Sequence, residues 1–224
     1  MTKKLLITGS NRGIGLELAK KFKSEGYDIY SILRHSSAEI KGLSNRIIDN
    51  IDFSDPKNIL NLVKQFEIND FDCCILNAGI LRNELIEDID LKISDQILEQ
   101  FTVNSLAPLI LASQCKDYMK DRSKLALITS RMGSIEDNGS GSRYGYRMSK
   151  AALNAAGKSL SIDLHSYGIA VGIFHPGYVR TEMTRLNGNI DPDKVATQLY
   201  ERIQELNLNN SGQFIHANGE QLPW

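Results

Sequence analysis

Short apolar segments alternate with amphipathic segments along the whole of this 224-residue chain. Lys4–Thr8 and Phe71–Leu76 have the length of strands, and the second is almost continuously apolar, as expected for a strand covered on both faces. Ile14–Phe22 and Tyr146–His165 repeat their apolar residues at helical spacing. Strand–helix alternation repeated this often predicts an α/β fold in which helices cover both faces of a parallel sheet.

The remaining segments follow the same alternation. Strands are predicted over Asp28–Arg34, Arg46–Phe53, Lys124–Ser130, Ile169–His175 and Gln213–Ala217. Helices are predicted over Ser36–Ser44 (one short helix), Pro56–Phe66, Ile93–Met119 (two segments around Pro108) and Asp191–Leu206. Because neither a low-complexity linker nor a repeat divides the chain, we expect a single doubly wound domain over residues 1–224.

The charge balance argues against several classes of partner. With 26 Lys and Arg against 27 Asp and Glu, the net charge of −1 gives no electrostatic reason to expect a nucleic acid or an anionic membrane. No segment approaches the ~20 apolar residues of a membrane span, and the apolar run near the N-terminus is too short for a signal peptide. We therefore expect a cytoplasmic protein whose cysteines, Cys73, Cys74 and Cys115, are reduced and buried. The four histidines are scattered without ligand spacing, so no metal site is expected.

The first predicted strand runs directly into a glycine-rich turn that opens the first helix. Its glycines, Gly9, Gly13 and Gly15, have the spacing G-x-x-x-G-x-G. The pyrophosphate of a dinucleotide binds against backbone N–H groups at a helix N-terminus, and a Cβ atom there would hold it away. This turn at the first strand–helix junction therefore predicts a dinucleotide site and a Rossmann fold. A purely structural turn is the alternative.

The glycine spacing resembles that of the short-chain dehydrogenase/reductase family, and three further motifs occur in the order found there. They are Asn77-Ala78-Gly79 after the fourth strand, Ser130 at the end of the fifth, and Tyr146-x-x-x-Lys150. The resemblance covers nearly the whole chain. The runs 130–135, 144–150 and 175–183 and the terminal Leu-Pro-Trp resemble the branch of C-factor-like and sniffer-like carbonyl reductases.

Tyr146 and Lys150 lie one turn apart on the same face of a predicted helix. A phenol with a pKa near 10 is a poor acid at pH 7, and a neighbouring ammonium lowers that pKa by stabilising the phenolate. Ser130 can donate a hydrogen bond to a substrate oxygen from the other side. The resemblance implies that Asn104 holds a water that connects Lys150 to solvent. The expected catalytic set is therefore Asn104, Ser130, Tyr146 and Lys150, although a Tyr-x-x-x-Lys pattern by itself often arises by chance.

The end of the second strand bears on the choice of cofactor. An NAD-preferring site usually carries a carboxylate there, and that carboxylate would repel a 2′-phosphate. Here the strand ends in Arg34 and His35, and Arg34 could bind the phosphate through its planar fork. Arg12 in the glycine turn is the second candidate. The resemblance implies NADP(H) in preference to NAD(H), and two solvated surface arginines are the alternative.

The resemblance implies a role for further residues. Asp52 would meet the adenine amino group, Val179 would bind the carboxamide through its backbone, Thr181 would contact the pyrophosphate, and Lys150 would bind the nicotinamide ribose. The whole expected cofactor-binding set is Gly9, Asn11, Arg12, Gly13, Ile14, Gly15, Arg34, Asp52, Phe53, Asn77, Ala78, Gly79, Tyr146, Lys150, Pro176, Gly177, Val179 and Thr181. Pro176-Gly177 on its own could equally be an ordinary turn.

These features together predict NADPH-dependent reduction of a small carbonyl compound, an aldehyde, ketone or quinone, with hydride from nicotinamide C4 and a proton from Tyr146. A cofactor-binding signalling or redox-sensing protein with little turnover is the alternative. The resemblance also implies a homodimer or homotetramer paired through the long helices, and the small residues of 151–157 would suit such packing or would face the sheet. The acidic cluster Glu84–Asp90 is interpreted as a solvated face.

Overall fold

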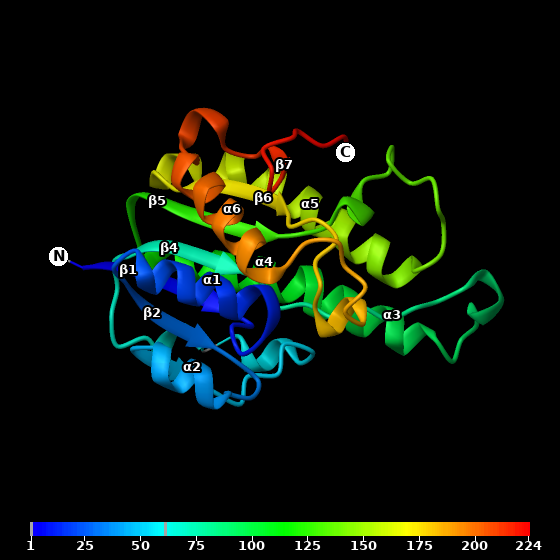
Figure 1. Cartoon of the computed structure of the whole chain (residues 1–224), viewed down its shortest axis with the longest axis horizontal. Coiled ribbons are helices and arrows are strands. Elements are labelled where there is room, and N and C mark those ends of the chain that lie inside the picture. The colour runs from blue at the N-terminus through cyan, green and yellow to red at the C-terminus, as the bar shows by residue number, and fades with distance from the viewer. Residues whose placement is uncertain (1, 61) are drawn as a thin grey trace.

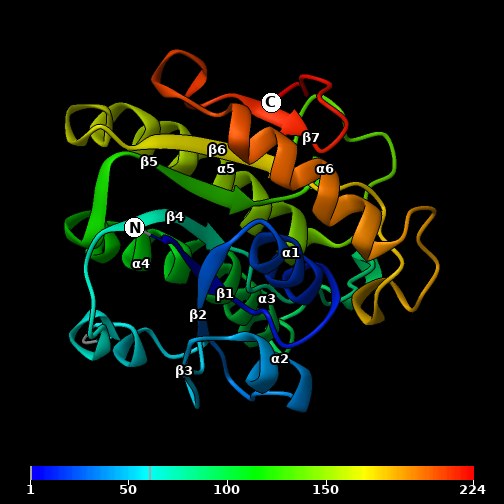
Figure 2. The same cartoon turned by 60° about the vertical axis from the view of Figure 1, so that its left-hand side comes forward.

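Seven parallel strands form one sheet in the computed structural model, which describes residues 2–60 and 62–224. They are β1 (Lys3–Thr8), β2 (Tyr27–Ile32), β3 (Arg46–Ile48), β4 (Phe71–Leu76), β5 (Met119–Ile128), β6 (Ala170–His175) and β7 (Phe214–His216). Their order is β3-β2-β1-β4-β5-β6-β7, and every neighbouring pair is parallel. Figure 2 shows the sheet running from β3 at one edge to β7 at the other.

Helices cover both faces of this sheet. They are α1 (Gly13–Ser24), α2 (Ala38–Leu43), α3 (Ser94–Phe101), α4 (Ala107–Cys115), α5 (Tyr144–Asp163) and α6 (Pro192–Glu205). Figure 1 shows α1 and α6 on one face and α4 and α5 on the other. Each face has its own hydrophobic core, so the doubly wound fold is confirmed. None of the described helices is long and apolar enough to cross a membrane.

The strand order reverses at one place in the sheet. The chain builds outward from β1 to β3, and then returns to place β4 through β7 on the other side of β1. The loops that follow β1 and β4 therefore diverge at the carboxyl ends of two adjacent strands, which is where doubly wound sheets bind ligands. The glycine turn follows β1, and Asn77–Gly79 follows β4.

One predicted strand is shorter in the structure. We expected the third strand over Arg46–Phe53, whereas β3 ends at Ile48. Asn50 has a φ of 62°, a left-handed conformation that is incompatible with a continuing strand. The backbone turns there, and Asp52 and Phe53 lie in a loop.

The predicted helix over Pro56–Phe66 is wrong in type. In its described residues the chain forms two 3₁₀ turns, Pro56–Asn58 and Leu62–Gln65. Asn61 lies outside the described residues. Asparagine favours turns because its side chain competes for backbone hydrogen bonds, and this segment has two of them.

The predicted break near Pro108 is a π turn, Thr102–Leu106, between α3 and α4. In a regular helix the ring of Pro108 would clash with the carbonyl of Asn104, four residues earlier. The N–H of Ala107 bonds instead to the carbonyl of Thr102, five residues earlier, and this widens the turn. The turn carries the buried side chain of Asn104 toward α5, where it meets Ser149.

Candidate active site

The turn after β1 has backbone that only glycine accommodates easily. The φ angle is 67° at Gly9 and 55° at Gly13. A Cβ atom on Gly9 would lie 2.9 Å from the Cα atom of Ala78, and one on Gly15 would lie 2.2 Å from the carbonyl oxygen of Gly9. These glycines therefore let the turn after β1 pack against the turn after β4 at the start of α1, and a helix N-terminus without Cβ atoms at the turn is what the pyrophosphate of a dinucleotide requires.

Hydrogen bonds tie this turn to the one after β4. The hydroxyl oxygen of Thr8 accepts from the N–H groups of Asn77 at 3.0 Å and Ala78 at 3.1 Å. The side-chain amide of Asn77 donates to the carbonyl oxygen of Gly9 at 3.1 Å. Thr8 was not among the predicted site residues, although its hydroxyl holds together the two turns that were.

Other members of the predicted cofactor set lie along the same edge of the sheet. A Cβ atom on Gly13 would lie 3.5 Å from the Cγ2 atom of Thr181, so the loop after β6 lies over the glycine turn. Phe53 and Ala78 line one small cavity with Thr8. The remaining members lie in the glycine turn, the first turn of α1 and the loop after β6: Asn11, Ile14, Pro176 and Gly177.

The two predicted phosphate-binding arginines differ in their surroundings. Arg34 follows β2 and is exposed, close enough to Asp52 to contribute to the lowering of that carboxyl's pKa, which is due mainly to hydrogen bonds from Ser54. Arg12 forms an ion pair with Glu182, which connects the glycine turn to the loop after β6. Both partners of this pair are largely exposed, so the pair contributes little to stability.

Ser130, Tyr146 and Lys150 come together as predicted. All three are buried, although they come from the end of β5 and the first two turns of α5. The Ser130 hydroxyl accepts from the N–H of Met132 at 3.1 Å and lies close enough to the Tyr146 phenol to oppose, by a smaller effect, the rise in its pKa. The Nζ atom of Lys150 lies 5.8 Å from the centre of the Tyr146 ring and donates to the carbonyl oxygen of Ile128 at 3.0 Å.

Burial dominates the protonation of this cluster. It raises the pKa of Tyr146 to about 12, and the opposing effects of Ser130 and the Arg143 charge are smaller. It lowers the pKa of Lys150 to about 8. The sequence suggested a lowered phenol pKa, whereas the net pKa of Tyr146 is raised in the protein alone, because the desolvation of the phenolate outweighs the effects of neighbouring groups.

The side chain of Asn104 is held on three sides. Its Oδ1 atom accepts from the N–H of Ile80 at 2.8 Å, and its Nδ2 atom donates to the Ile80 carbonyl and to the Ser149 hydroxyl, both at 2.9 Å. A Cβ atom on Gly79 would lie 3.1 Å from the same Oδ1 atom and 3.7 Å from the Nζ atom of Lys150. Asn104 thus fastens the end of β4 to α5 beside Lys150, and its water-holding role stays a prediction.

The backbone of Val179 is built into a tightly folded loop. Its carbonyl oxygen accepts from the hydroxyl of Thr184 at 2.6 Å. A Cβ atom on Gly188 would lie 2.1 Å from its carbonyl carbon. A carboxamide bound to this carbonyl would therefore share it with Thr184.

The interpretation of Glu84–Asp90 as a solvated face is wrong for Glu84, which has no exposed surface. The sequence feature that could have predicted the burial of Glu84 lies at the start of α5. Helix α5 begins after Arg143, with no capping side chain at that position and no acidic residue in its first turn. A helix that begins in this way needs acceptors from another segment for its first N–H groups.

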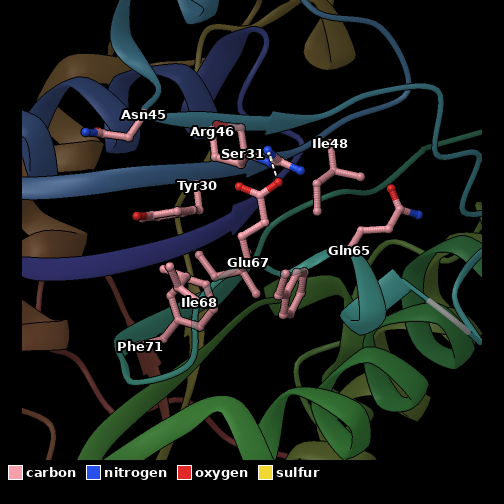
Figure 3. Close-up of a pocket in the computed structure, with 11 residues that line it drawn as sticks. Tyr30, Ser31, Asn45, Arg46, Ile48, Gln65, Glu67, Ile68 and Phe71 are labelled. Atoms are coloured by element: carbon pink, nitrogen blue, oxygen red, sulfur yellow. Dashed lines mark ion pairs between the residues drawn. The ribbon is translucent and has the colours of Figure 1, made fainter.

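A separate cavity of about 180 Å³ lies beside β2 and β3 and contains none of the predicted site residues. Figure 3 shows Tyr30, Ile68 and Phe71 among its walls, with the ion pair between Arg46 and Glu67. The candidate site is therefore identified by the convergence of the loops after β1, β4, β5 and β6, and not by this cavity.

The cysteines lie away from the site. Cys73, Cys74 and Cys115 are buried and free of disulfides, as expected. Within the residues that the structure describes, no group of three or more His, Cys, Asp or Glu side chains is placed to hold a metal ion.

Comparisons with known proteins agree with this geometry. A profile described as short chain dehydrogenase matches residues 3–190. The chain is 27% identical to 1-hydroxy-2-glutathionyl-2-methyl-3-butene dehydrogenase of Rhodococcus sp. (strain AD45) in an alignment 226 positions long, gaps included, that covers 98% of this chain and 99% of that protein. It is 40% identical to C-signal of Myxococcus xanthus over 127 residues, which cover 55% of this chain and 76% of that protein.

Among solved structures, the carbonyl reductase Sniffer of D. melanogaster superposes with a TM-score of 0.87 at 27% identity. The superposition covers the whole of both chains. The similarity to C-signal and to Sniffer confirms the branch that the sequence motifs indicated.

Proposed function

The chain belongs to the short-chain dehydrogenase family and is an oxidoreductase; on this premise we propose that it reduces an aldehyde, ketone or quinone to an alcohol with NADPH. The observation that carries the proposal is the buried Tyr146, placed between Ser130 and Lys150 at the carboxyl edge of the sheet. The glycine turn that could receive a dinucleotide lies at the same edge.

The residues around the glycine turn fit a dinucleotide. Gly9, Asn11, Gly13, Ile14 and Gly15 would hold the pyrophosphate through backbone N–H groups. Asp52, Phe53 and Asn77–Gly79 would surround the adenosine half. The backbone of Pro176–Val179 would hold the nicotinamide half, Thr181 beside Gly13 would contact the pyrophosphate, and Tyr146 and Lys150 would bind the nicotinamide ribose.

The chemistry divides between cofactor and protein. A bound reduced nicotinamide supplies hydride to the carbonyl carbon. Tyr146 keeps its proton at neutral pH because its pKa is about 12, and it can therefore give that proton to the carbonyl oxygen. Ser130 donates a hydrogen bond to the same oxygen and stabilises its developing charge. The Lys150 ammonium stabilises the phenolate that Tyr146 becomes.

Replacing Tyr146 by Phe tests this mechanism. The variant keeps the ring but has no proton to donate, so we expect kcat to fall by about 10²- to 10⁴-fold. NADPH affinity should change little. The measurement is loss of NADPH absorbance with a panel of aldehydes, ketones and quinones, and binding is measured by titration. A Phe variant with wild-type kcat would refute the proposal.

The preference for NADPH rests on Arg34, with Arg12 as a second contact. An arginine–phosphate contact contributes about 1.5–3 kcal/mol, so Arg34→Ala should weaken NADPH binding by at least about tenfold and leave NADH binding unchanged. Arg122→Ala is the matched control, because Arg122 is a largely exposed arginine on β5, away from the carboxyl edge of the sheet. The preference is disproved if wild-type protein binds NADH as tightly as NADPH at the same salt concentration.

A cofactor-binding signalling protein with little turnover is the second candidate, and the similarity to C-signal favours it. A sensor needs only the glycine turn, whereas this chain also brings Ser130, Tyr146 and Lys150 together. The same panel distinguishes the two: NADPH binding without oxidation of NADPH by any carbonyl would support the sensor.

A further inference from the structure

Glu84, in the loop after β4, is a carboxylate with no exposed surface. Burying an ionised carboxylate is expensive unless hydrogen bonds or a cation compensate it. No ion pair includes Glu84 in the part of the chain that the structure describes. Its environment must therefore supply hydrogen-bond donors.

Those donors come from two helices. The Nε2 atom of Gln100, on α3, donates to Oε1 of Glu84 at 2.5 Å. The backbone N–H of Gly145, in the first turn of α5, donates to Oε2 at 3.3 Å. The main-chain carbonyl of Glu84 accepts from the N–H of Arg143 at 2.8 Å. One residue of a loop thus joins α3 to the start of α5.

The start of α5 depends on this contact. Arg143, at the N-cap position, has left-handed backbone and no capping side chain. A Cβ atom on Gly145 would lie 2.4 Å from the Nε2 atom of Gln100 and 3.1 Å from Oε1 of Glu84. The carboxylate supplies the acceptor and the negative charge that the N-terminus of a helix favours.

The residue after Gly145 is Tyr146. We propose that Glu84 is a positioning residue for the reaction proposed above: by holding the N–H of Gly145 and the amide of Gln100, it fixes the first turn of α5 so that the Tyr146 hydroxyl stays beside Ser130. The inference rests on that proposed function, and it adds a residue that does not itself touch the reacting atoms.

A second connection one helical turn away supports this role. Asn104 follows Gln100 by four residues, and Ser149 follows Gly145 by four. The Asn104 amide donates to the Ser149 hydroxyl at 2.9 Å. The catalytic helix is therefore held to α3 and the π turn at two successive levels, with Tyr146 between them.

The orientation of Gln100 makes a sharp test possible. Its Oε1 atom accepts from the backbone N–H of Arg82 at 2.8 Å, so its amide cannot turn over without losing that bond. In Glu84→Gln, the new amide has two orientations. In one, its NH₂ group faces the NH₂ group of Gln100; in the other, it faces the N–H of Gly145, which then has no acceptor at position 84. In the double variant Glu84→Gln with Gln100→Glu, the carboxylate at position 100 accepts from both Arg82 and position 84, and the amide oxygen at position 84 accepts from Gly145. The one contact that this exchange does not restore is the long one, 3.5 Å, from the Nε2 atom of Gln96 on α3 to Oε1 of Glu84.

We expect Glu84→Gln to lower kcat by about 10- to 100-fold, the loss typical of a small misplacement of a catalytic group. NADPH affinity should stay within about twofold, because the glycine turn follows β1 and because Asn77 and Ala78, in the same loop as Glu84, are held separately by the Thr8 hydroxyl. Hydrogen exchange at the Gly145 amide should accelerate. The double variant should recover kcat to within about threefold of wild type and restore the slow exchange. Glu87→Gln, an exposed position in the same loop, should match wild type in every measurement.

The outcomes separate the two proposals. If no carbonyl in the panel supports oxidation of NADPH by the wild-type protein, the proposed function fails. In that case, hydrogen exchange at the Gly145 amide that is unchanged in Glu84→Gln would overturn the inference about Glu84 independently. If wild type is active and folded Glu84→Gln has lower stability but normal kcat, Glu84 is only structural and the inference fails. Failure of the folded double variant to recover also overturns it. If Glu84→Gln does not fold, Gln100→Met, which removes one donor, must lower kcat without changing NADPH affinity.

Discussion

At the scale of single residues, the site contains a charge that works against folding. Lys150 is 4% exposed, and its described hydrogen bond is with one backbone carbonyl. Its pKa falls from 10.5 to about 8 because the ammonium is desolvated. A shift of this size corresponds to roughly 3 kcal/mol of destabilisation at pH 7, where the amine is charged in both the folded and the unfolded chain.

Lys150→Met should therefore stabilise the protein while abolishing activity. At pH 7 we expect the free energy of unfolding to rise by about 1–3 kcal/mol, after allowing for the lost hydrogen bond. The wild-type protein recovers stability as pH rises from about 8 toward 10.5, because the folded chain releases its proton first, so the difference should shrink over that range. Urea denaturation at several pH values measures it. A variant less stable than wild type at pH 7 would contradict this account.

The residues of the site could be predicted unevenly. Gly9, Tyr146 and Lys150 can be identified from the sequence, because their chemistry requires a particular residue type at a particular spacing. Glu84 could not be found in this way, since an acidic residue in a polar loop looks solvated until the fold places α3 and α5 against it. The pKa of Tyr146 was misjudged because helical spacing reveals the neighbouring amine but not the burial of both groups.

At the scale of elements, the alternation of strands and helices was sufficient to predict the sheet and most helices. The failures were local. β3 ends two residues before the left-handed Asn50, and the described residues of 56–66 form 3₁₀ turns at Pro56–Asn58 and Leu62–Gln65, because weak local preferences there are decided by packing. Most other helices and strands begin and end within two residues of the predicted positions, because the apolar periodicity of their sequences is strong.

The pairing of β6 with β7 places two histidines against each other. His175 and His216 are register partners, with ring centres 5.0 Å apart. Burial lowers the pKa of His175 to about 3, with smaller contributions from His216 and Arg131. Because its unfolded pKa is near 6.5, the unfolded chain binds a proton first as pH falls, and stability is lost between pH 6.5 and 3.

His175→Phe should remove this acid sensitivity while retaining an aromatic ring. Between pH 6 and pH 4 the free energy of unfolding of wild type should fall by about 1 kcal/mol per pH unit more than that of the variant. Chemical denaturation across this range provides the comparison. Parallel pH dependences for the two proteins would show that His175 is not the group responsible.

At the scale of the whole molecule, an apolar strip remains uncovered on the side of α3, α4 and α5. Met148, Ala155 and Ile162 recur every seven residues on the exposed side of α5, while Gly157 faces the sheet. Leu98 is 60% exposed and Leu109 38% exposed on the neighbouring helices. If the predicted homodimer or homotetramer forms through these helices, these exposed apolar side chains lie on the face that it uses, and the assembly itself stays a prediction.

Sedimentation can test this assembly. We expect wild-type protein to sediment as a homodimer or homotetramer and Ile162→Asp, which places a charge on a 67% exposed apolar position, to sediment as a monomer. Leu60→Asp, at a 58% exposed leucine elsewhere on the surface, is the control and should keep the wild-type state. A monomeric wild type would exclude the assembly.

The strand order also bears on how the chain is made. After β1, every strand pairs with a strand that precedes it in the chain: β2 and β3 extend the sheet on one side of β1, and β4 to β7 extend it on the other. Each strand can therefore join the sheet as soon as it leaves the ribosome. The glycine turn and its partner Ala78 are complete once β4 has emerged, long before Tyr146 is synthesised. A nascent chain can therefore pair the strands that frame the proposed dinucleotide site before it has made the helix that carries Tyr146 and Lys150.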